Sequence, residues 1–371
     1  MPGCATAQRE DGGPRVLSFS AAFLRGACSA VFAGLGSPAR EAALVAAELV
    51  EANLMGYDSH GIVRTPEYVD YTRRGRFVPG ARLRITRRRR NTAIVDCGLN
   101  FGQVGATFMT DLACRKARRG GIAYIVSTRC GHVGRVGAYV QRAAEKGLFA
   151  LATCNNQKAG HIVAPWGGRE GRLGTNPLAF AAPTDAWPVV LDMSTCMIPG
   201  GKLNMLKLAG KPAPPGCIQD ANGLPSTDPS VITALSLEPE APTGTILPFG
   251  SEYGYKGYGL SMMVEIMGGI MAGLDMSADN PGSNGFSIIV VDPDAFCGRA
   301  LFRRLVDGMC AYQMSSAPRP GCTEVVVPGL YDFRTREKRL AEGIPVTEEV
   351  WDLVIGAGRD VGVNVPREEK A

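Results

Sequence analysis

The sequence predicts an α/β fold in which strands and helices alternate along the middle of the chain, after a mostly helical N-terminal part. Short runs of branched apolar residues alternate with segments of helical apolar spacing from about residue 93 to residue 153. The hydrophobic fraction is 45% of 371 residues and the charged fraction is 20%. This composition is typical of a folded chain with a large core, as one big domain or two intertwined ones.

The N-terminal part is expected to begin with a tail and to continue with two helices. Residues 1–15 lack the apolar core of a secretory signal, and we expect a disordered tail there. Ser37 and Pro38 stand in the order of a helix start, and Ala39–Leu54 then has apolar residues at helical spacing. A second helix is predicted over Thr65–Arg74. A glycine follows each of these helices within two residues.

The strands and helices of the middle region follow from the period of the apolar residues. Strands are predicted at Ala93–Val95, Ile122–Ser127, Leu148–Thr153, Val189–Leu191, Phe286–Val291 and Glu324–Val327, and helices at Gln103–Arg118, Ala138–Lys146 and Gly259–Gly273. The helix Gly259–Gly273 is apolar and rich in methionine, so we expect it to be buried. The segment Lys211–Pro229 is rich in proline and glycine, which predicts a long ordered loop.

The charge balance favours a protein without a nucleic-acid partner. The net charge is +5, from 40 basic and 35 acidic residues, which is a weak bias in a chain of this length. The run Arg87–Arg90 can be interpreted as a phosphate contact or as a solvated turn before the strand-like Thr92–Val95. The solvated turn is favoured, because a single basic run is usually exposed.

The cysteines indicate a reducing compartment. The 11 cysteines are scattered and form no C-x-x-C pair, which argues against a zinc framework or a redox dithiol. Buried thiols of this kind are typical of the cytosol, so we expect a cytoplasmic protein without a bound metal. No apolar run is long enough to cross a bilayer, and no membrane partner is expected.

Three histidines, His60, His132 and His161, are the residues that can exchange a proton near neutral pH. His132 lies in the loop Gly131–Gly137, where glycines recur as G-x-x-G-x-x-G between a predicted strand and a predicted helix. Glycines let a backbone approach a ligand closely, and a helix start favours phosphate. A tight turn without a ligand explains the same glycines equally well. His161 is interpreted as structural.

A second candidate site surrounds His60. This residue belongs to the segment Asp58–Gly61, at the end of a predicted helix and four residues before Arg64. The planar guanidinium of Arg64 is suited to hold a substrate carboxylate. In the alternative interpretation, Asp58 or Ser59 only caps a helix and His60 is partly exposed. A Ser-His hydrolase is not supported, because no G-x-S-x-G motif is present.

Two further segments combine glycines with polar side chains. Thr175 and Asn176 stand between Gly174 and Pro177, in a pattern suited to ribose or amide recognition, although an ordinary Asn-Pro turn is favoured. Lys256 lies among glycines in Tyr255–Gly259 before an apolar helix, where a lysine can meet a phosphate or a substrate oxygen. A solvated lysine on a turn is an equal alternative.

Together these motifs resemble the type-2 malate/lactate dehydrogenase family, which includes malate, lactate, sulfolactate and ureidoglycolate dehydrogenases and an imine-reducing branch. The resemblance runs from about Phe19 to about Gly362 and is carried by Asp58–Gly61 with Arg64, Pro66 and Tyr68, Phe101–Val104, Gly131–Gly137, Ala164–Gly168, Leu173–Pro177, Leu191–Thr195, Gly201-Lys202, Tyr255–Gly259, Pro328-Gly329 and Glu342–Pro345. The segments His132–Gly137 and Pro214–Cys217 are most similar to the bacterial hydroxycarboxylate dehydrogenases.

The resemblance implies a fold and an assembly. The cofactor fold would be a non-Rossmann mixed sheet flanked by helices, with helical N-terminal and C-terminal regions, in agreement with the missing G-x-G-x-x-G motif. The corresponding organisation is a helical substrate and dimerisation region at residues 16–80, a cofactor-binding α/β domain at 81–335 and a C-terminal helical region at 336–371 that packs with the first. A homodimer is expected, in which the partner chain helps to complete the site.

The resemblance also assigns site residues by position. NAD or NADP would be lined by His132, Val133, Gly134, Arg135, Val136, Asn156, Thr175, Asn176, Asp192, Met193, Ser194, Lys256, Pro328 and Gly329. A small 2-hydroxy or 2-oxo acid of the malate, lactate or hydroxypyruvate type would face Ser59, His60, Arg64, Tyr68, Gly201 and Lys202.

The predicted reaction is hydride transfer between this acid and the nicotinamide. His132 is favoured as the acid/base group, because the hydroxyl proton sits next to the carbon that loses hydride, and it should titrate near neutrality. The pair of Ser59 and His60 is the alternative. Two other functions stay open, namely an imine reductase acting on a cyclic 2-imino carboxylate and an inactive dimeric relative.

The sequence departs from the family pattern at four places. Gly200 stands where many members have arginine or an aromatic residue, and Leu330 stands where an acidic or amide residue is usual. The segment Ile232–Tyr253 is longer than in most members and Asp275–Gly285 is shorter. Gly200 and the segment Ile232–Tyr253 bear on the substrate, and Leu330 bears on one cofactor contact.

Overall fold

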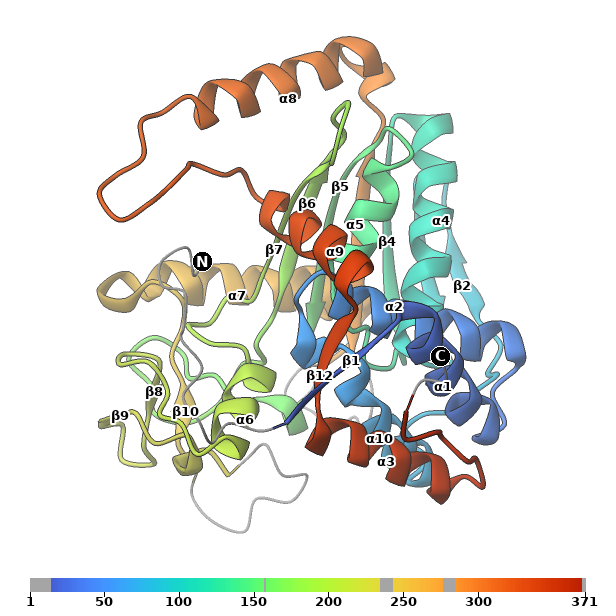
Figure 1. Ribbon diagram of the computed structural model, residues 1–371. Helices are drawn as coiled ribbons and strands as arrows, with labels where there is room; N and C mark the ends of the chain where they lie inside the picture. Colours follow the sequence, from blue (N-terminus) through green and yellow to red (C-terminus); the bar gives the residue numbers. More distant parts are fainter. Residues whose placement is uncertain (1–14, 157, 234–242, 276–283, 369–371) are drawn as a thin grey trace.

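The computed structural model describes residues 15–156, 158–233, 243–275 and 284–368. A tall mixed sheet forms the centre, helices from both ends of the chain form a second layer beside it, and a small three-stranded sheet lies below (Figure 1). The residues 1–14 of the expected tail and most of the departing segment Asp275–Gly285 lie outside the described residues, as does part of Ile232–Tyr253.

The central sheet has seven strands in the order β2-β3-β4-β11-β5-β6-β7. The strands are β2 (Arg84–Arg88), β3 (Thr92–Asp96), β4 (Ile122–Thr128), β5 (Phe149–Asn155), β6 (Leu178–Ala182), β7 (Val189–Met193) and β11 (Gly285–Val291). The pair β3–β4 is parallel, whereas the other neighbouring pairs are antiparallel. The predicted α/β fold with a non-Rossmann mixed sheet is therefore confirmed.

Helices cover both faces of this sheet, as the alternation of side chains along β4 shows. Ala123 and Ile125 point to one face, into the core shared with α4 (Gly102–Gly120) and α5 (Gly137–Ala144). Tyr124 points to the other face, where its hydroxyl donates to the Met267 carbonyl of α7 (Tyr255–Gly268) at 2.8 Å. On that face α8 (Arg299–Met314) contacts the end of β5, with the rings of Phe149 and Phe302 6.5 Å apart.

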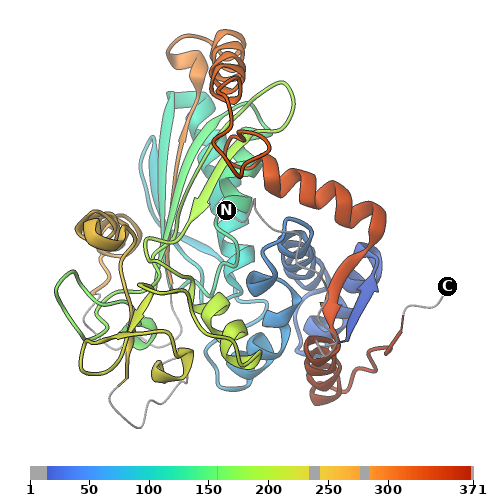
Figure 2. The ribbon, with the colours of Figure 1, turned by 60° about the vertical axis from the view of Figure 1, so that its left-hand side comes forward.

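The two ends of the chain build one helical layer (Figure 2). Its elements are β1 (Val16–Phe19), α1 (Ala21–Gly34), α2 (Ala39–Leu54), α3 (Thr65–Arg73), α9 (Leu330–Glu342), β12 (Ile344–Thr347) and α10 (Glu348–Asp360). Strands β1 and β12 pair antiparallel, and Trp351 of α10 is fully buried against Phe19 and Phe23, at ring distances of 4.6 and 5.7 Å. Burial of these rings ties the first described residues to the last helix.

The third unit is small and lies under the sheet. It contains α6 (Gly200–Leu208) and the strands β8 (Ile218–Gln219), β9 (Pro225–Ser226) and β10 (Thr245–Ile246), around a separate apolar core. The predicted loop Lys211–Pro229 is thus a strand-bearing segment. Short 3-10 helices complete the fold: η1 (Asp58–His60), η2 (Ile62–Arg64), η3 (Lys158–Gly160), η4 (Pro229–Val231), η5 (Ser251–Tyr253), η6 (Ile270–Ala272) and η7 (Pro293–Ala295).

Three sequence predictions are wrong. No strand forms at Glu324–Val327, because the one backbone bond to the sheet edge lies beyond this segment, from the Val190 amide to the Pro328 carbonyl. The run Arg87–Arg90 is exposed as expected, but its first two residues end strand β2 instead of lying in a turn. The helix over Gly259–Gly273 is not buried in the chain, since residues such as Met263 are 49% exposed.

The predicted domain boundaries stay a prediction. The boundary at 335/336 falls inside helix α9, so no linker marks it. Residues of the N-terminal helices and of α10 share one apolar core, whereas the sheet and helices α4 and α5 share another. Phe333 of α9 belongs to the sheet core, so this helix joins the two layers.

Candidate active site

His60 and His132 lie face to face where the sheet meets the helical layer. Their rings are 5.9 Å apart between centroids and 15° from parallel. His60 ends the 3-10 helix η1, after α2, and His132 lies in the loop between β4 and α5. The sequence separation is 72 positions, counted as 132 minus 60, so only the tertiary fold brings the two candidate histidines into one site.

A polar network fixes the segment that carries His60. Asn53, at the end of α2, accepts the backbone N–H of Ile62 at 2.8 Å and donates to Asp58 at 2.7 Å. Arg339 of α9 binds both carboxylate oxygens of Asp58, at 2.7 and 3.0 Å. A side chain at Gly61 would overlap the Asn53 amide. The C-terminal helix α9 therefore helps to hold the N-terminal histidine in place.

The loop that carries His132 leaves backbone donors without partners. Within the part of the chain that the structure describes, no acceptor binds the backbone N–H groups of His132–Val136. Val133, Arg135 and Val136 are nonetheless buried, and Gly134 has a φ of 72°. Unpaired buried N–H groups are costly, and successive N–H groups on such a turn form a concave anion site. The loop therefore fits the phosphate or amide oxygens of a dinucleotide.

A buried hydrogen-bond chain holds the His132 ring. The Tyr68 hydroxyl lies 2.8 Å from Nδ1 of His132, and Nε2 of Gln103 lies 2.7 Å from the same hydroxyl. Tyr68 and Gln103 are both fully buried. The other ring nitrogen of His132, Nε2, has no partner among the described residues, so it is the atom that can meet a ligand.

Arg64 lies beside the histidines, and two of its three guanidinium nitrogens are bound to the protein. Its Nε donates to the Ser59 carbonyl at 2.7 Å, and its Nη1 binds Glu67 at 2.5 Å. Its Nη2 has no acceptor in the described chain and faces Gly201, where a Cβ would come within 2.8 Å. Glycine at position 201 therefore keeps Nη2 accessible. Ser59 completes the group, with its hydroxyl 3.1 Å from Nδ1 of His60.

Burial and positive charge keep both histidines neutral. Burial lowers the pKa of His132 from 6.5 to about 4, and Arg64 contributes to this shift. Burial also lowers the pKa of His60 well below its usual value, with Arg64 and His132 adding to the effect. For His132, this direction is opposite to the expectation of a group that titrates near neutrality, which stays a prediction for the pH profile of the enzyme. Burial alone would raise the pKa of Glu67, but the contact with Arg64 outweighs it and brings this pKa to about 2.

Several predicted cofactor residues form a second group behind the glycine loop. Asp192 of β7 accepts the Gly137 N–H at 2.8 Å and lies 3.6 Å from Nε of the buried Arg135. The Arg135 guanidinium stacks 5.0 Å over the Tyr57 ring. Gly329, next to Pro328, packs against Val190 of the same strand. Arg135, Asp192 and Pro328-Gly329 thus lie around one end of the loop, although the Arg135 side chain points into the protein.

In the described chain, no hydrogen bond or ion pair joins the remaining predicted residues to His60 or His132. Asn176 is buried and donates to Ser261 and Glu265 of α7 at 2.9 and 2.7 Å, with Thr175 as its neighbour in the chain. The carbonyl of Asn156 lies 3.3 Å from Nε2 of His161. The Ser194 hydroxyl donates to the Cys196 carbonyl at 3.3 Å, after Met193 at the end of β7. Lys202 and Lys256 are exposed, with the Lys256 ammonium 5.1 Å from the Tyr253 ring centre.

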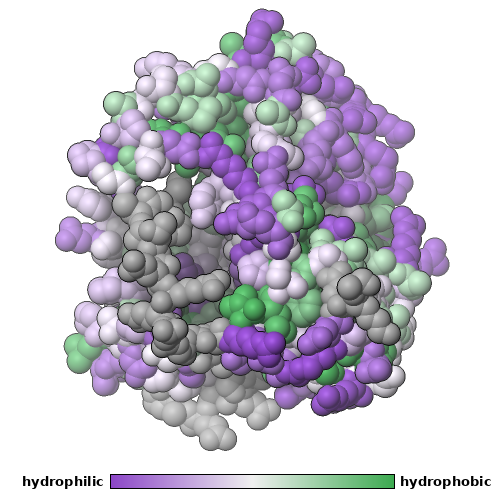
Figure 3. Space-filling model, in the orientation of Figure 1, coloured by the Kyte–Doolittle hydropathy of each residue, from purple (hydrophilic) through white to green (hydrophobic). Residues whose placement is uncertain are grey.

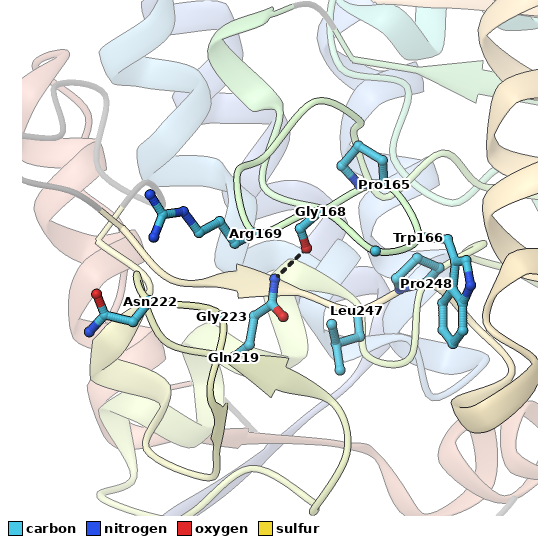
Figure 4. A pocket seen from close by; sticks show the side chains of 10 residues that line it. Pro165, Trp166, Gly168, Arg169, Gln219, Asn222, Gly223, Leu247 and Pro248 are labelled. Atoms are coloured by element: carbon cyan, nitrogen blue, oxygen red, sulfur yellow. Dashed lines mark hydrogen bonds between the residues drawn. The ribbon is translucent and has the colours of Figure 1, made fainter.

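A separate depression lies between the small sheet and α7 (Figure 4). Its volume is about 610 Å³, and residues 165–168 and Gln219 line it together with Leu247 and Pro248. Nε2 of Gln219 donates to the Gly168 carbonyl at 3.0 Å across its floor. None of the lining residues belongs to the histidine site.

Sequence reasoning assigned no role to three residues of the histidine site. Glu67 orients Arg64, and the spacing of three positions between them on a helix could have revealed the pair. Gln103 belongs to the family motif Phe101–Val104, but its role depends on Tyr68, 35 positions away in the sequence, and no pattern pointed to the contacts of Asn53. In the described segments, no group of three or more His, Cys, Asp and Glu side chains is arranged to hold a metal ion. None of the described helices combines the length and apolar character of a membrane span.

The fold and the paired histidines define an α/β protein with a non-Rossmann mixed sheet and proton-exchanging groups at the junction of its two layers. Residues 19–354 match the malate/L-lactate dehydrogenase family, and the chain belongs to this family. It is 32% identical to hydroxycarboxylate dehydrogenase B of Escherichia coli O157:H7, over 93% of this chain and 94% of the relative. It is 34% identical to malate dehydrogenase of Pyrococcus horikoshii, with 90% and 92% coverage.

A solved structure supports the same conclusion. The crystal structure of malate dehydrogenase from Entamoeba histolytica aligns with a TM-score of 0.88 and 26% identity, over 95% of this chain and all of that one. The family predicted from the motifs is confirmed, and with it the prediction of an oxidoreductase of the hydroxy acid dehydrogenase class.

The lowered pKa of His132 predicts a pH-dependent loss of stability. Between pH 6.5 and about 4 the unfolded chain binds a proton at His132 that the folded chain does not bind. The contribution of His132 to the free energy of unfolding should therefore be complete above pH 6.5 and should decrease as the pH falls to about 4. In His132→Asn this part of the slope should disappear. Urea titrations of both proteins across this range measure the difference, and equal slopes would contradict the assignment.

Proposed function

We propose that this protein transfers a hydride between a nicotinamide cofactor and a small 2-hydroxy acid of the malate, lactate or hydroxypyruvate type, which becomes the 2-oxo acid. The observation that carries this proposal is the cluster of two neutral histidines beside an arginine nitrogen, Nη2 of Arg64, that has no acceptor among the described residues. A neutral imidazole accepts the hydroxyl proton, and the guanidinium binds the carboxylate of the same molecule.

NAD or NADP would lie along the glycine loop. The N–H groups of His132–Val136, which have no acceptor among the described residues, are donors for its phosphate or carboxamide oxygens, and Asp192 holds the end of the loop through Gly137. When bound, the nicotinamide ring accepts or gives the hydride. The other predicted cofactor contacts, at Asn156, Thr175, Asn176, Met193, Ser194, Lys256, Pro328 and Gly329, belong to the same proposal.

Different residues bind the substrate carboxylate, exchange its hydroxyl proton and orient the molecule. Nη2 of Arg64 holds the carboxylate, which fixes the position of the 2-carbon. Nε2 of His132 takes the proton from the 2-hydroxyl group and returns it in the reverse reaction. His60, held by Ser59, orients the substrate, and Gly201 leaves room for it beside Arg64. The buried Tyr68 acts through its hydrogen bond to His132, and Lys202 belongs to this proposal as the exposed neighbour of Gly201.

An imine reductase is the second candidate. The hydrogen bond between Ser59 and Nδ1 of His60, 3.1 Å long, favours it, because this pair offers a second proton donor beside Arg64. A cyclic 2-imino carboxylate also places a carboxylate next to its reducible carbon. Comparing pyruvate-type acids with a cyclic imine, using NADH and NADPH, separates the two activities and identifies the cofactor. Failure to bind either cofactor would favour the inactive dimeric relative.

We also propose a homodimer whose interface includes helices α7 and α8. Leu260, Met263, Ile266 and Ile270 are all exposed along α7 and η6, and Leu305 and Met309 are 59% and 48% exposed on α8. Hydrophobic residues gather at the upper left of Figure 3, where α8 lies in Figure 1. Apolar surface of this extent on one face of the sheet favours a protein partner. This surface lies outside residues 16–80, where the sequence placed dimerisation.

A cytoplasmic location completes the proposal. The ten cysteines in the described residues are free thiols, which favours a reducing compartment. The proposed partners are the acid and a second copy of the chain, without nucleic acid or membrane, and the exposed arginines of β2 are interpreted as a solvated strand face.

Substitution of each histidine tests the assignment of the acid/base group. His132→Asn should lower kcat by about a hundredfold or more, the usual contribution of general acid-base catalysis, while the protein still binds cofactor. His60→Asn should mainly raise KM for the acid. Steady-state kinetics at saturating cofactor measure both effects. The reverse pattern would transfer the acid/base role to His60 and support the imine reductase.

Arg64→Lys tests the carboxylate site. Lysine keeps the charge but cannot bind Ser59, Glu67 and a substrate together, as the guanidinium does. The expected loss in kcat/KM for 2-oxo acids is about 2 kcal/mol or more, typical of a charged hydrogen bond. Cofactor affinity, measured by fluorescence titration, serves as the internal control and should be nearly unchanged. Unaltered efficiency would remove Arg64 from the substrate site.

Sedimentation measurements test the dimer. The wild-type chain should sediment as a dimer at micromolar concentration, and the double variant Met263→Glu/Ile270→Glu should sediment as a monomer, because buried carboxylates at an interface are strongly unfavourable. Leu353→Glu is the matched control, since Leu353 on α10 is 51% exposed but lies on another surface. A wild-type monomer with full activity would contradict the proposal.

A further inference from the structure

The Tyr68 hydroxyl connects His132 to one other side chain. It lies 2.8 Å from Nδ1 of His132 and 2.7 Å from the Gln103 amide, and the described residues offer it no third partner. Tyr68 and Gln103 are both 0% exposed, so bulk water does not take part in this chain. The positions of the protons in these hydrogen bonds therefore depend on the side chains of His132, Tyr68 and Gln103 alone.

A single hydroxyl proton decides which nitrogen of His132 is protonated. If Tyr68 donates to Nδ1, the neutral imidazole carries its hydrogen on Nε2 and cannot accept a proton from a substrate there. If Nδ1–H donates to Tyr68 instead, Nε2 has a free lone pair. In that case the Tyr68 proton needs an acceptor of its own.

Gln103 carries the only acceptor available to this proton among the described side chains. Its Oε1 atom is buried and has no hydrogen-bond partner. A half-turn of the amide exchanges Oε1 and Nε2, which places the oxygen against the Tyr68 hydroxyl. We propose that Gln103 is a positioning residue that accepts the Tyr68 proton and so holds His132 with its hydrogen on Nδ1. This inference rests on the proposed acid/base role of His132.

The backbone around the amide keeps the chain in place. Gln103 is the second residue of α4, and a side chain on the first, Gly102, would overlap the carbonyl oxygens of Gly131 and His132. On the other side, a Cβ at Gly134 would lie 3.2 Å from the Gln103 amide. Gln103 and His132, the two ends of the hydrogen-bonded row, are therefore carried by backbone segments that are in direct contact.

The same hydrogen bonds serve both protonation states of His132. In the neutral form Nδ1–H donates to Tyr68 and Nε2 is free, and in the imidazolium form Nδ1–H still donates to Tyr68 while Nε2 holds the substrate proton. No side chain has to turn during proton transfer. An amide nitrogen facing Tyr68 would instead lock the unreactive form.

Nuclear magnetic resonance of the wild-type protein tests the inference without any activity measurement. With isotope-labelled histidine, nitrogen shifts distinguish a hydrogen on Nδ1 from one on Nε2, and the three histidines are assigned with the single Asn variants. At neutral pH His132 is neutral, because burial lowers its pKa to about 4. In the protein with bound reduced cofactor, we expect the hydrogen of neutral His132 on Nδ1. A hydrogen on Nε2 in the same complex would overturn the inference.

Two variants of Gln103 give the second readout. Gln103→Met keeps the volume but removes the acceptor, so His132 should shift towards the Nε2–H form and kcat should fall about tenfold or more, with KM and cofactor affinity nearly unchanged. Gln103→Glu keeps an acceptor, so it should retain the Nδ1–H form, and its charge should move the acid limb of the pH profile to higher pH. An unchanged tautomer in Gln103→Met would overturn the inference.

The two failures are distinguishable. If His132→Asn turns over normally, the proposed acid/base role of His132 fails. If His132→Asn is inactive but Gln103→Met keeps both the tautomer and kcat, only the role of Gln103 fails. Should Gln103→Met not fold, Tyr68→Phe removes the same hydroxyl link and must show the same change of tautomer.

Discussion

The close contact between the start of helix α4 and the loop before α5 is the constraint on which the site depends. Glycines at positions 102 and 131 allow the two backbones to touch, and a side chain on either would overlap a carbonyl oxygen. This contact places Gln103 next to Tyr68 and turns His132 towards His60. The N–H groups of the same loop have no acceptor in the described chain. The contact between the two backbones therefore positions both His132 and the proposed cofactor-binding loop.

The electrostatics of the site follow from burial around a single cation. Arg64 stands near both histidines, and desolvation together with its charge keeps them neutral. Glu67 compensates part of that charge and stays ionised, because its pKa is about 2. On the proposed function, the carboxylate of a bound acid offsets the positive charge further and raises the pKa of His132 towards neutrality. Substrate binding would thereby match the base to the proton it has to exchange.

Local patterns were reliable where one element contains its own signal. The helix predicted over Ala39–Leu54 has those bounds in the structure, and the strand predicted at Phe286–Val291 is one residue longer. The predictions failed where the partner surface decides. Glu324–Val327 has the composition of a strand, but the bond to the sheet edge is made by the next residue, Pro328. The apolar helix α7 is exposed because the described residues do not cover it. The period of apolar residues predicts that an element has an apolar face, but it does not predict which surface covers that face.

The sequence by itself determined the α/β class, the family, and the candidate histidines and arginine, because these depend on residue type, period and motif order. The tertiary structure alone decided which of the candidates share a site. It joined Ser59, His60, Arg64, Gly201 and His132, and it gave Lys256 and Asn176 other partners, Tyr253 and Glu265. It also set the charge state of the histidines and revealed Gln103. Burial and contacts between segments far apart in the sequence produce these features, and no local pattern encodes a distance of this kind.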